Sequence, residues 1–232
     1  MLRTPPPNPM TVQHYIALDI DPLAPTDTVG HAAYRFADLD AEHLPVVDED
    51  GRLVALVAEE EVLELTTPTV ELSTIAGLGA VSVGSDAHVF EAANLLVVHR
   101  LSLLPVVEEG VYLGVIRRST VFETFAAMLA TGRPGTVLVL EVPTRDYSLT
   151  QLSHLVEQSG GRVLSASAQM PLEAGGDATF LRVTLKLNVS DTARIRYLLE
   201  HNSYRVTAVF NEEESEDDLS LRVQEFMRYL EV

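Results

Sequence analysis

Two adjacent arginines, Arg117 and Arg118, are the residues of this sequence best suited to hold an anion. The chain has 16 basic and 34 acidic residues and a formal net charge of −18. An anionic ligand therefore needs a local group of basic residues such as this pair. A guanidinium presents a planar fork of N–H donors that matches a phosphate. A surface pair that contacts neighbouring carboxylates, or helps a dimer contact, is an equally good interpretation.

No arrangement of side chains in the sequence indicates catalysis. The seven histidines form no i, i+4 pair and have no companion acid at metal-binding spacing. No G-x-S-x-G run occurs, and the glycines of residues 77–84 do not have the G-x-G-x-x-G spacing of a dinucleotide site. We therefore expect a protein that is not an enzyme and holds no metal.

The composition indicates a globular, cytoplasmic protein. Hydrophobic residues make up 47% and charged residues 22% of the 232 residues, enough to bury a full core. The negative charge argues against nucleic acid and anionic membranes as partners. The absence of cysteine excludes disulfides and thiolate chemistry, and the first ten residues have no apolar core of the signal-peptide type.

An internal repeat organises the first half of the chain. The run LPVV at residues 44–47 returns at 104–107, and Val29 returns as Val89, all at an offset of 60 residues. After the acidic turn the offset falls to 59, because DEDG becomes EEG. A single deletion within a turn is tolerated between two strands, so the repeat is structural.

Each copy predicts a lead-in strand, a helix, two strands joined by the acidic turn, and a second helix. Apolar residues recur at helical spacing after Asp27 or Thr26, either of which could cap the first helix, and again after Asp86. Short apolar runs bounded by turn residues predict buried strands at residues 44–47, 53–57, 104–107 and 112–116.

A second domain is expected after the break at residues 131–135, TGRPG. Its predicted order is β-α-β-β-α-β, the ferredoxin-like order. Within residues 180–189 the apolar residues alternate with Arg182, Thr184, Lys186 and Asn188, which we expect to face water. The predicted strands are 137–142, 162–170, 180–189 and 205–210, with helices from about Leu149 and Asp191.

The chain ends in an acidic run followed by an apolar stripe. Residues 211–218, NEEESEDD, contain six carboxylates, and we favour a solvated linker over a metal or partner site. The spacing from Leu219 to Leu230 predicts an amphipathic helix that docks on this protein or on a second copy of it.

The doubled unit, with LPVV before a turn and an apolar strand running into a polar helix start, resembles a tandem pair of CBS (cystathionine-beta-synthase) domains. The part that follows resembles an ACT domain, and the whole resembles bacterial CBS-ACT proteins of the acetoin-utilisation regulator type. The resemblance implies an α/β (α+β) fold, with β-α-β-β-α repeats and a βαββαβ domain. The expected parts are CBS repeats at 10–70 and 71–131, an ACT-like domain at 135–210, and a linker and helix at 211–232.

The resemblance also implies an adenine nucleotide such as AMP, ADP or ATP between the repeats. A Gly-apolar-apolar-Thr-x-x-Asp run in the family supplies a hydroxyl for phosphate and a carboxylate for the ribose diol. Here the first copy has Glu61 for the aspartate, and the second has Thr120, with Arg117 and Arg118 before it. The nucleotide-binding residues so implied are Leu23, Pro45, Val46, Glu61, Val83, Pro105, Val106, Arg117, Arg118 and Thr120.

In the ACT-like part, the resemblance implies a possible ligand loop formed by Arg145, Asp146, Tyr147 and Ser148. Tyr147 stands where the family has a glycine, and a side chain there obstructs close approach of the backbone to a ligand. Ser148 and Gln151 fit an S-x-x-Q capping box. We therefore rank amino-acid binding below dimerisation through the sheet edges of this domain.

Two functions remain open. The first is a non-catalytic sensor of a small metabolite, in which an adenine nucleotide changes how the subunits of a homodimer meet. The second is a ligand-independent dimeric adaptor whose ligand sites are degenerate. A sensor should gain stability in the presence of its ligand, whereas an adaptor should copurify with a regulated target protein.

Overall fold

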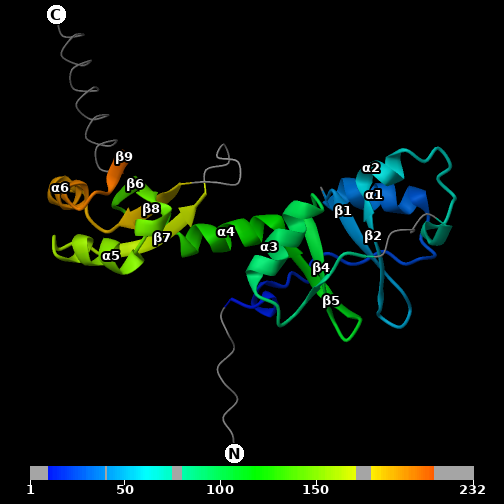
Figure 1. Cartoon of the computed structure of the whole chain (residues 1–232). Helices are drawn as coiled ribbons and strands as arrows, with labels where there is room; N and C mark the ends of the chain where they lie inside the picture. The colour runs from blue at the N-terminus through cyan, green and yellow to red at the C-terminus, as the bar shows by residue number, and fades with distance from the viewer. Residues whose placement is uncertain (1–9, 40, 75–79, 171–178, 212–232) are drawn as a thin grey trace, which may run out of the picture. The chain divides into compact units, whose positions relative to one another are not determined.

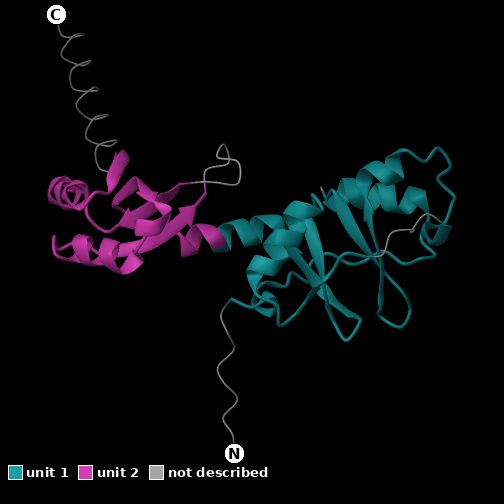
Figure 2. Cartoon of the chain, in the orientation of Figure 1, with its two compact units in different colours: residues 1–124 teal, residues 125–232 magenta. Residues whose placement is uncertain are grey.

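The computed structural model describes residues 10–39, 41–74, 80–170 and 179–211. The chain divides into two compact units, residues 1–124 and 125–232 (Figure 2). The mixed α/β fold predicted from the sequence is confirmed. The predicted acidic run and the apolar stripe that follows it lie outside the described residues.

The first unit contains the predicted repeat (Figure 1). Both copies form a helix, an antiparallel hairpin and a second helix at the predicted places, but the predicted lead-in strand forms only in the second copy, at Val83–Gly84, because in the first copy Leu23 makes an isolated bridge to Val46. In chain order the elements are η1 (Val12–Tyr15), α1 (Val29–Leu39), β1 (His43–Val47), β2 (Leu53–Ala58), α2 (Glu59–Leu63), η2 (Leu72–Thr74), β3 (Val83–Gly84), α3 (Val89–Val98), β4 (Leu103–Glu108), β5 (Val111–Arg117) and α4 (Arg118–Met128), whose last residues belong to the second unit.

The two hairpins have the same irregularities. The pairing of β1 with β2 shifts register at Val47, and the pairing of β4 with β5 shifts at Val107, its equivalent. A β-bulge bends and twists the strand that contains it. Because both hairpins are bent at the same point, the two halves have quasi-equivalent backbones and not merely similar sequences.

The lead-in segments of the two halves are exchanged. Thr11, which precedes the first half, pairs with His88 at the start of α3 in the second half. Glu71, which precedes the second half, pairs with Thr28 at the start of α1 in the first half. The two pairs are equivalent under the 60-residue offset, so each half completes the other.

The apolar core of the first half extends into the second half. It is centred on Phe36 and Leu44 of the first half, both fully buried, and it also includes Leu103 and Val115 of the second half. Burial of apolar side chains is the main favourable term in folding, at roughly 25 cal/mol per Å². The two halves therefore bury apolar surface against each other.

The cap of α1 differs from the prediction. The helix begins after Thr28, whose hydroxyl accepts a hydrogen bond from the backbone N–H of His31 at 3.2 Å. Neither Asp27 nor Thr26 is the cap, because Asp27 instead closes the preceding turn by accepting from the backbone N–H of Ala24 at 2.7 Å. Two candidate caps next to a third polar residue cannot be ranked by sequence alone.

The cap of α3 also differs from the prediction. A ring nitrogen of His88 accepts from the backbone N–H of Phe90 at 3.2 Å, so His88 and not Asp86 caps the helix. The chain is still turning at Asp86, since the backbone N–H of Ala87 donates to the carbonyl of Gly84. Histidine is not among the preferred capping residues, which is why the sequence pointed to the aspartate.

The second unit has the predicted β-α-β-β-α-β order. Its strands form one antiparallel sheet in the order β7-β8-β6-β9, and α5 and α6 pack on the core made by one sheet face. The elements are β6 (Thr136–Pro143), η3 (Thr144–Asp146), α5 (Leu149–Glu157), β7 (Val163–Gln169), β8 (Phe180–Leu187), α6 (Ala193–His201) and β9 (Arg205–Asn211).

The alternation in β8 is confirmed except at Lys186. This residue is only 5% exposed, although it lies on the face predicted to be wet. Its register partner is Ser165, whose hydroxyl donates to the carbonyl of Leu129 at 2.9 Å. The chain just after α4 therefore lies against this face of the sheet, and the sequence of β8 carries no sign of that cover.

Gly114 is a position where the exchange of segments forbids a side chain. Its φ is +141°, and a Cβ would lie 2.5 Å from Cγ2 of Ile16 and 2.7 Å from the carbonyl oxygen of Ala17. We expect Gly114→Ala to lower the free energy of unfolding of the first unit by about 2 kcal/mol or more. Urea denaturation followed by circular dichroism measures this change.

The quasi-equivalent position in the first half is occupied by Ala55 and provides the control. Ala55→Gly should cost only about 1 kcal/mol, the usual penalty for glycine within a strand. Equal losses for the two variants would contradict the steric account of Gly114.

Candidate ligand site

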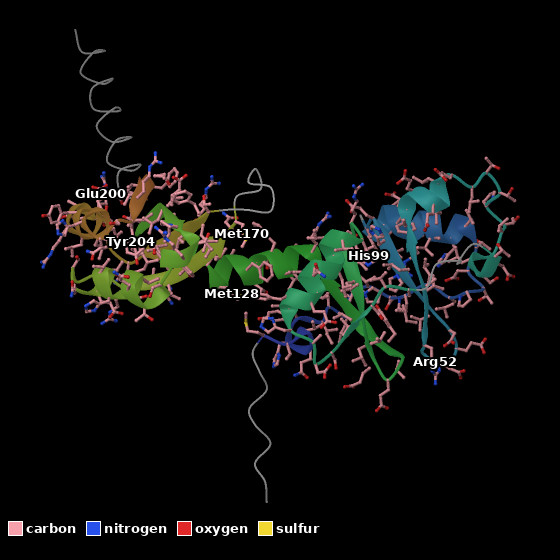
Figure 3. The ribbon with its side chains drawn as sticks, viewed as in Figure 1. Arg52, His99, Met128, Met170, Glu200 and Tyr204 are labelled. Atoms are coloured by element: carbon pink, nitrogen blue, oxygen red, sulfur yellow. The ribbon has the colours of Figure 1, made fainter. Side chains whose placement is uncertain are left out.

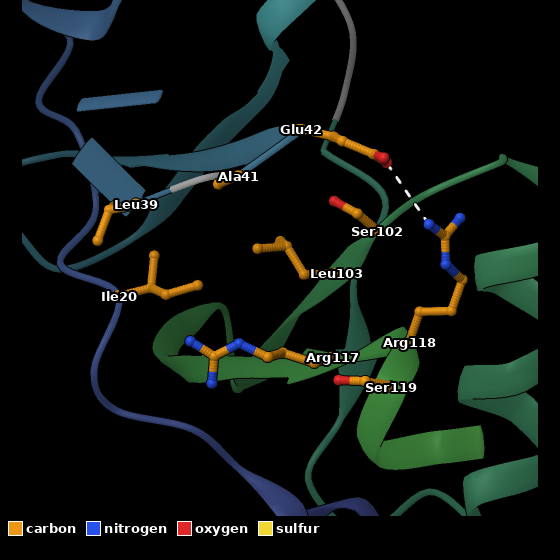
Figure 4. Close-up of a pocket in the computed structure, with 9 residues that line it drawn as sticks. All are labelled: Ile20, Leu39, Ala41, Glu42, Ser102, Leu103, Arg117, Arg118 and Ser119. Carbon is orange, nitrogen blue, oxygen red and sulfur yellow. Dashed lines mark ion pairs between the residues drawn. The ribbon is translucent and has the colours of Figure 1, made fainter. Parts of the chain in front are cut away.

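A cavity of about 290 Å³ lies between the two halves of the first unit. Figure 4 shows residues of both halves around it, with the arginines on one side and apolar side chains from the first half opposite. Its volume is near the lower end of the roughly 300–1,000 Å³ typical of small-molecule sites. The lining residues are Ile20, Leu39, Ala41, Glu42, Ser102, Leu103, Arg117, Arg118 and Ser119.

The junction between β5 and α4 provides the basic side of the cavity. Arg117 is the last residue of β5, and Arg118 and Ser119 begin α4. The backbone N–H of Arg118 donates to the carbonyl of Ser102 at 2.9 Å, which fixes this turn against the second half. The first turn of α4 contains no acidic residue, so its positive dipole end adds to the field of the guanidinium groups.

Both arginines are paired with carboxylates. Nη2 of Arg117 lies 2.9 and 3.0 Å from the two carboxylate oxygens of Asp19, and this hydrogen bond lowers the pKa of the Asp19 carboxyl. Nη2 of Arg118 lies 3.6 Å from Oε2 of Glu42 (Figure 4). The charges at the mouth of the cavity are therefore balanced, two against two.

The equivalent junction in the first half is acidic. Under the repeat, Arg118 corresponds to Glu59, the first of three glutamates that begin α2. The third, Glu61, accepts from the backbone N–H of Ala58 at 2.9 Å and so caps its own helix. The quasi-equivalent backbones thus place opposite charges at the two strand-to-helix junctions.

A half-buried polar contact at the cavity joins the two halves. A ring nitrogen of His43, which precedes LPVV in the first half, lies 3.0 Å from the hydroxyl of Ser102, its neighbour across the halves. Burial lowers the pKa of the His43 imidazole, and the charges of Glu42 and Glu61 oppose this only in part. His43 is therefore held in its neutral form.

Most of the apolar residues predicted for the nucleotide site belong to the core and do not line this cavity. Leu23 pairs with Val46, and Val83 with Val106, as equivalent parallel pairings. All four side chains are buried, as are Pro45 and Pro105 within β1 and β4. Their predicted contact with a ligand stays a prediction.

The polar predicted residues divide into two groups. Arg117 and Arg118 line the cavity, whereas Glu61 and Thr120 are not among its lining residues. Thr120 lies in the first turn of α4, where its carbonyl accepts from the hydroxyl of Thr124 at 2.8 Å. The structure brings the arginines together with an apolar wall but leaves the family's aspartate position outside this cavity.

Several residues of the site were missed by sequence reasoning. Ser119 follows directly on the two arginines, and Glu42 and Ser102 occupy the same position of the repeat, just before HLPVV and LLPVV. The repeat therefore contained a signal for Glu42 and Ser102. No signal in the sequence pointed to Asp19 and Ile20, because only the folded chain brings the lead-in segment beside β5.

The predicted loop of the second unit has a structural role. The hydroxyl of Ser148 accepts from the backbone N–H of Gln151 at 3.3 Å, which confirms the predicted cap of α5. The side chain of Gln151 does not complete the capping box, because it accepts from the hydroxyl of Tyr204 at 3.0 Å. Tyr147 packs against the core, while Arg145 and Asp146 are exposed and pair with each other at 3.5 Å.

The described part of the chain contains neither a candidate metal-binding cluster nor a candidate membrane-spanning helix. Among those residues, no three or more His, Asp or Glu side chains are grouped so that they could hold a metal ion. Within the same part of the chain, every helix is too short or too polar to cross a membrane.

Comparison with known proteins identifies the first unit. A family model described as the CBS domain matches residues 14–66 and 77–127. Over 91 residues, 39% of this chain, the sequence is 28% identical to the inosine-5'-monophosphate dehydrogenase of Methanocaldococcus jannaschii. The match spans only 18% of that enzyme.

Similar solved structures cover about half of this chain. CBSX2 in complex with AMP is 22% identical, with a TM-score of 0.46, over 50% of this chain and 96% of its own. A Vibrio cholerae protein described as an acetoin utilization protein, AcuB, is 27% identical, with a TM-score of 0.46, over 52% and 93%. A CBS domain pair/ACT domain protein from Thermotoga maritima is 22% identical, with a TM-score of 0.49, over 52% and 99%.

The residues matched by the family model coincide with the two quasi-equivalent halves, so the first unit is a tandem pair of CBS domains.

The neutral state of His43 predicts a loss of stability in mild acid. Because burial lowers its pKa in the folded protein, the unfolded chain takes up a proton first as the pH falls through about 6.5. The free energy of unfolding should therefore fall between about pH 7.5 and about pH 5.5. Urea titrations across this range test it.

His43→Gln should flatten the dependence, because the titrating group is gone. His99→Gln, at an exposed position on the same unit (Figure 3), should leave it as in the parent. A pH dependence unchanged in His43→Gln would show that other groups are responsible.

Proposed function

We propose that this tandem CBS pair is a non-catalytic regulatory module that senses an adenine nucleotide, such as AMP, ADP or ATP, in the cavity between its two halves. The observation that carries the proposal is the combination, in one cavity, of two arginines and a helix N-terminus with an apolar wall. We further propose that residues 135–210 are an ACT-like domain, and that binding changes how the subunits of a homodimer meet.

The cavity can hold the parts of a nucleotide in separate places. Ile20, Leu39 and Leu103 offer apolar surface for the base. The N–H donors of Arg117 and Arg118 and the start of α4 suit a phosphate, which is favoured at helix N-termini.

The AMP complex of CBSX2 gives independent support for the choice of ligand, as a complex of that protein. In this chain the second repeat keeps the glycine of the family run, Gly114, but has Arg117 and Thr120 in place of its threonine and aspartate. The phosphate end of a nucleotide is therefore the part that this cavity holds best.

Titration calorimetry with AMP, ADP and ATP tests the proposal. The parent protein should bind at least one of them, and Arg117→Ala should weaken that binding roughly ten- to a hundredfold, because a charge-assisted hydrogen bond is lost. In thermal unfolding, the nucleotide should raise the midpoint of the parent more than that of Arg117→Ala, since a ligand that binds only the folded state raises its stability.

Arg52→Ala is the matched control. It removes the same charge from the outer end of the β1–β2 hairpin (Figure 3), away from the lining residues of the cavity. Its affinity should equal that of the parent. Equal weakening by both substitutions would indicate a general charge effect and not a site.

A second candidate function, a dimeric adaptor that needs no ligand, is favoured by the outer face of α3. Val97 and Val98 are 76% and 63% exposed. Their equivalents on α1 are Ala37 and Asp38, so only the second half carries this apolar face. The chain has a net charge of −18, so two copies repel each other wherever their carboxylates meet. An uncharged surface such as this one lets a second copy approach without that repulsion.

Light scattering tests this candidate. We expect the parent to have the molar mass of a dimer and Val97→Asp to shift it toward the monomer, because a buried unpaired charge is costly. Ala37→Asp, the same change at the equivalent position of α1, should leave the dimer intact. A dimer unaffected by Val97→Asp would place the interface elsewhere.

A further inference from the structure

The arginines of the cavity are each held by a carboxylate from the N-terminal part of the chain. Asp19 contacts Arg117 from the lead-in segment, and Glu42 contacts Arg118 from the start of the first hairpin. The side chains of Asp19 and Glu42 are 68% and 61% exposed. Water reaches both ion pairs, so a competing anion can reach them as well.

Asp19 lies on the segment that crosses from one half to the other. Ala17 pairs with Val115 in the second half, and Leu23 pairs with Val46 in the first. Between these anchors, in the described chain, no backbone–backbone hydrogen bond is made by residues 18–22. Ile20 of this crossover lines the cavity. The Asp19–Arg117 ion pair therefore fastens the crossover directly beside the proposed ligand.

The strength of these pairs suits competition. Exposed ion pairs of this kind change an equilibrium by roughly 1.5- to 5-fold. A phosphate monoester carries close to two negative charges near neutral pH and three acceptor oxygens. One group therefore brings both arginines the charge that otherwise takes two separate carboxylates. A phosphodiester carries a single charge, and an unphosphorylated nucleoside carries none.

The other strand-to-helix junction cannot take such a ligand. The positions equivalent to Arg117, Arg118 and Ser119 are Ala58, Glu59 and Glu60. Glu61 already occupies a backbone donor at the start of α2. Carboxylates at a helix N-terminus satisfy its dipole and repel an incoming anion.

We infer that Asp19 and Glu42 are internal competitors that make this cavity selective for ligands with a terminal phosphate monoester, one per chain, and that binding releases the crossover at Asp19. This inference rests on the proposed function and adds to it the ligand class, the stoichiometry and the residues that set the selectivity.

Calorimetry with AMP, cyclic AMP and adenosine as probes tests the inference on the full chain. The parent should bind AMP with one site per chain and in preference to cyclic AMP and adenosine. Asp19→Asn should bind AMP roughly two- to fivefold more tightly, and should gain affinity for cyclic AMP while its affinity for adenosine stays unchanged. Glu42→Gln, at the second ion pair, should change binding in the same direction.

Asp21→Asn is the matched control, because it removes the same charge two residues along the crossover, and Arg35, which contacts Asp21, donates to its backbone carbonyl at 3.0 Å and not to its carboxylate. Its affinity for AMP should stay close to that of the parent. Hydrogen exchange gives a second readout: AMP should speed exchange of the Ala17 amide, which donates to the carbonyl of Val115 at 2.8 Å next to the crossover, while it slows exchange at Arg117–Ser119. A ligand that only stabilised the fold would slow both.

The outcomes separate this inference from the proposed function. If the parent binds AMP but Asp19→Asn binds it no more tightly than Asp21→Asn does, competition by Asp19 is wrong and the sensor function stands. If only Asp19→Asn and Glu42→Gln bind AMP, the competition is supported in its strongest form. If no variant binds any probe, both the inference and the proposed function are overturned.

Discussion

The exchange of lead-in segments between the two halves is the constraint on which the rest of the first unit depends. Each half presents its helix start to a segment that precedes the other half, and the apolar core of the first half extends into the second. The segment that returns from Ala17 to Leu23 must therefore cross between the halves. A cavity lined from both sides, with the crossover at its edge, follows from this connectivity.

Quasi-equivalence of the backbone turns a few side-chain differences into a functional asymmetry. The hairpins share their bulges and their parallel pairings, so corresponding residues occupy corresponding places. Arginines at one junction and glutamates at the other then give equivalent places on the two halves side chains of opposite charge. A core of buried aliphatic residues is insensitive to that change, because charge at a strand end costs little while it stays in water.

The second unit shows how local and tertiary effects divide. Its element order and the cap at Ser148 were predictable, because hydrophobic periodicity and capping act over a few residues. The burial of Lys186 and the contact of Gln151 with Tyr204 were not, since both depend on segments distant in sequence. The same holds for the caps of α1 and α3, where several polar residues competed and the path of the preceding turn decided.

The sequence by itself determined the doubling, the hairpins and helices of the first unit, the element order of the second, and the opposite charges at the two junctions, because periodicity, turn residues and charge are local properties of the sequence. It also singled out Arg117 and Arg118. Only the tertiary structure decided which residues surround them: it buried Leu23, Val46 and their equivalents in the core, and it brought Asp19, Ile20, Glu42 and Ser102 to the cavity. The physical reason is that these contacts arise from the crossover between halves. The pattern of residues within a strand or helix reflects local contacts and does not indicate a neighbour almost a hundred positions away.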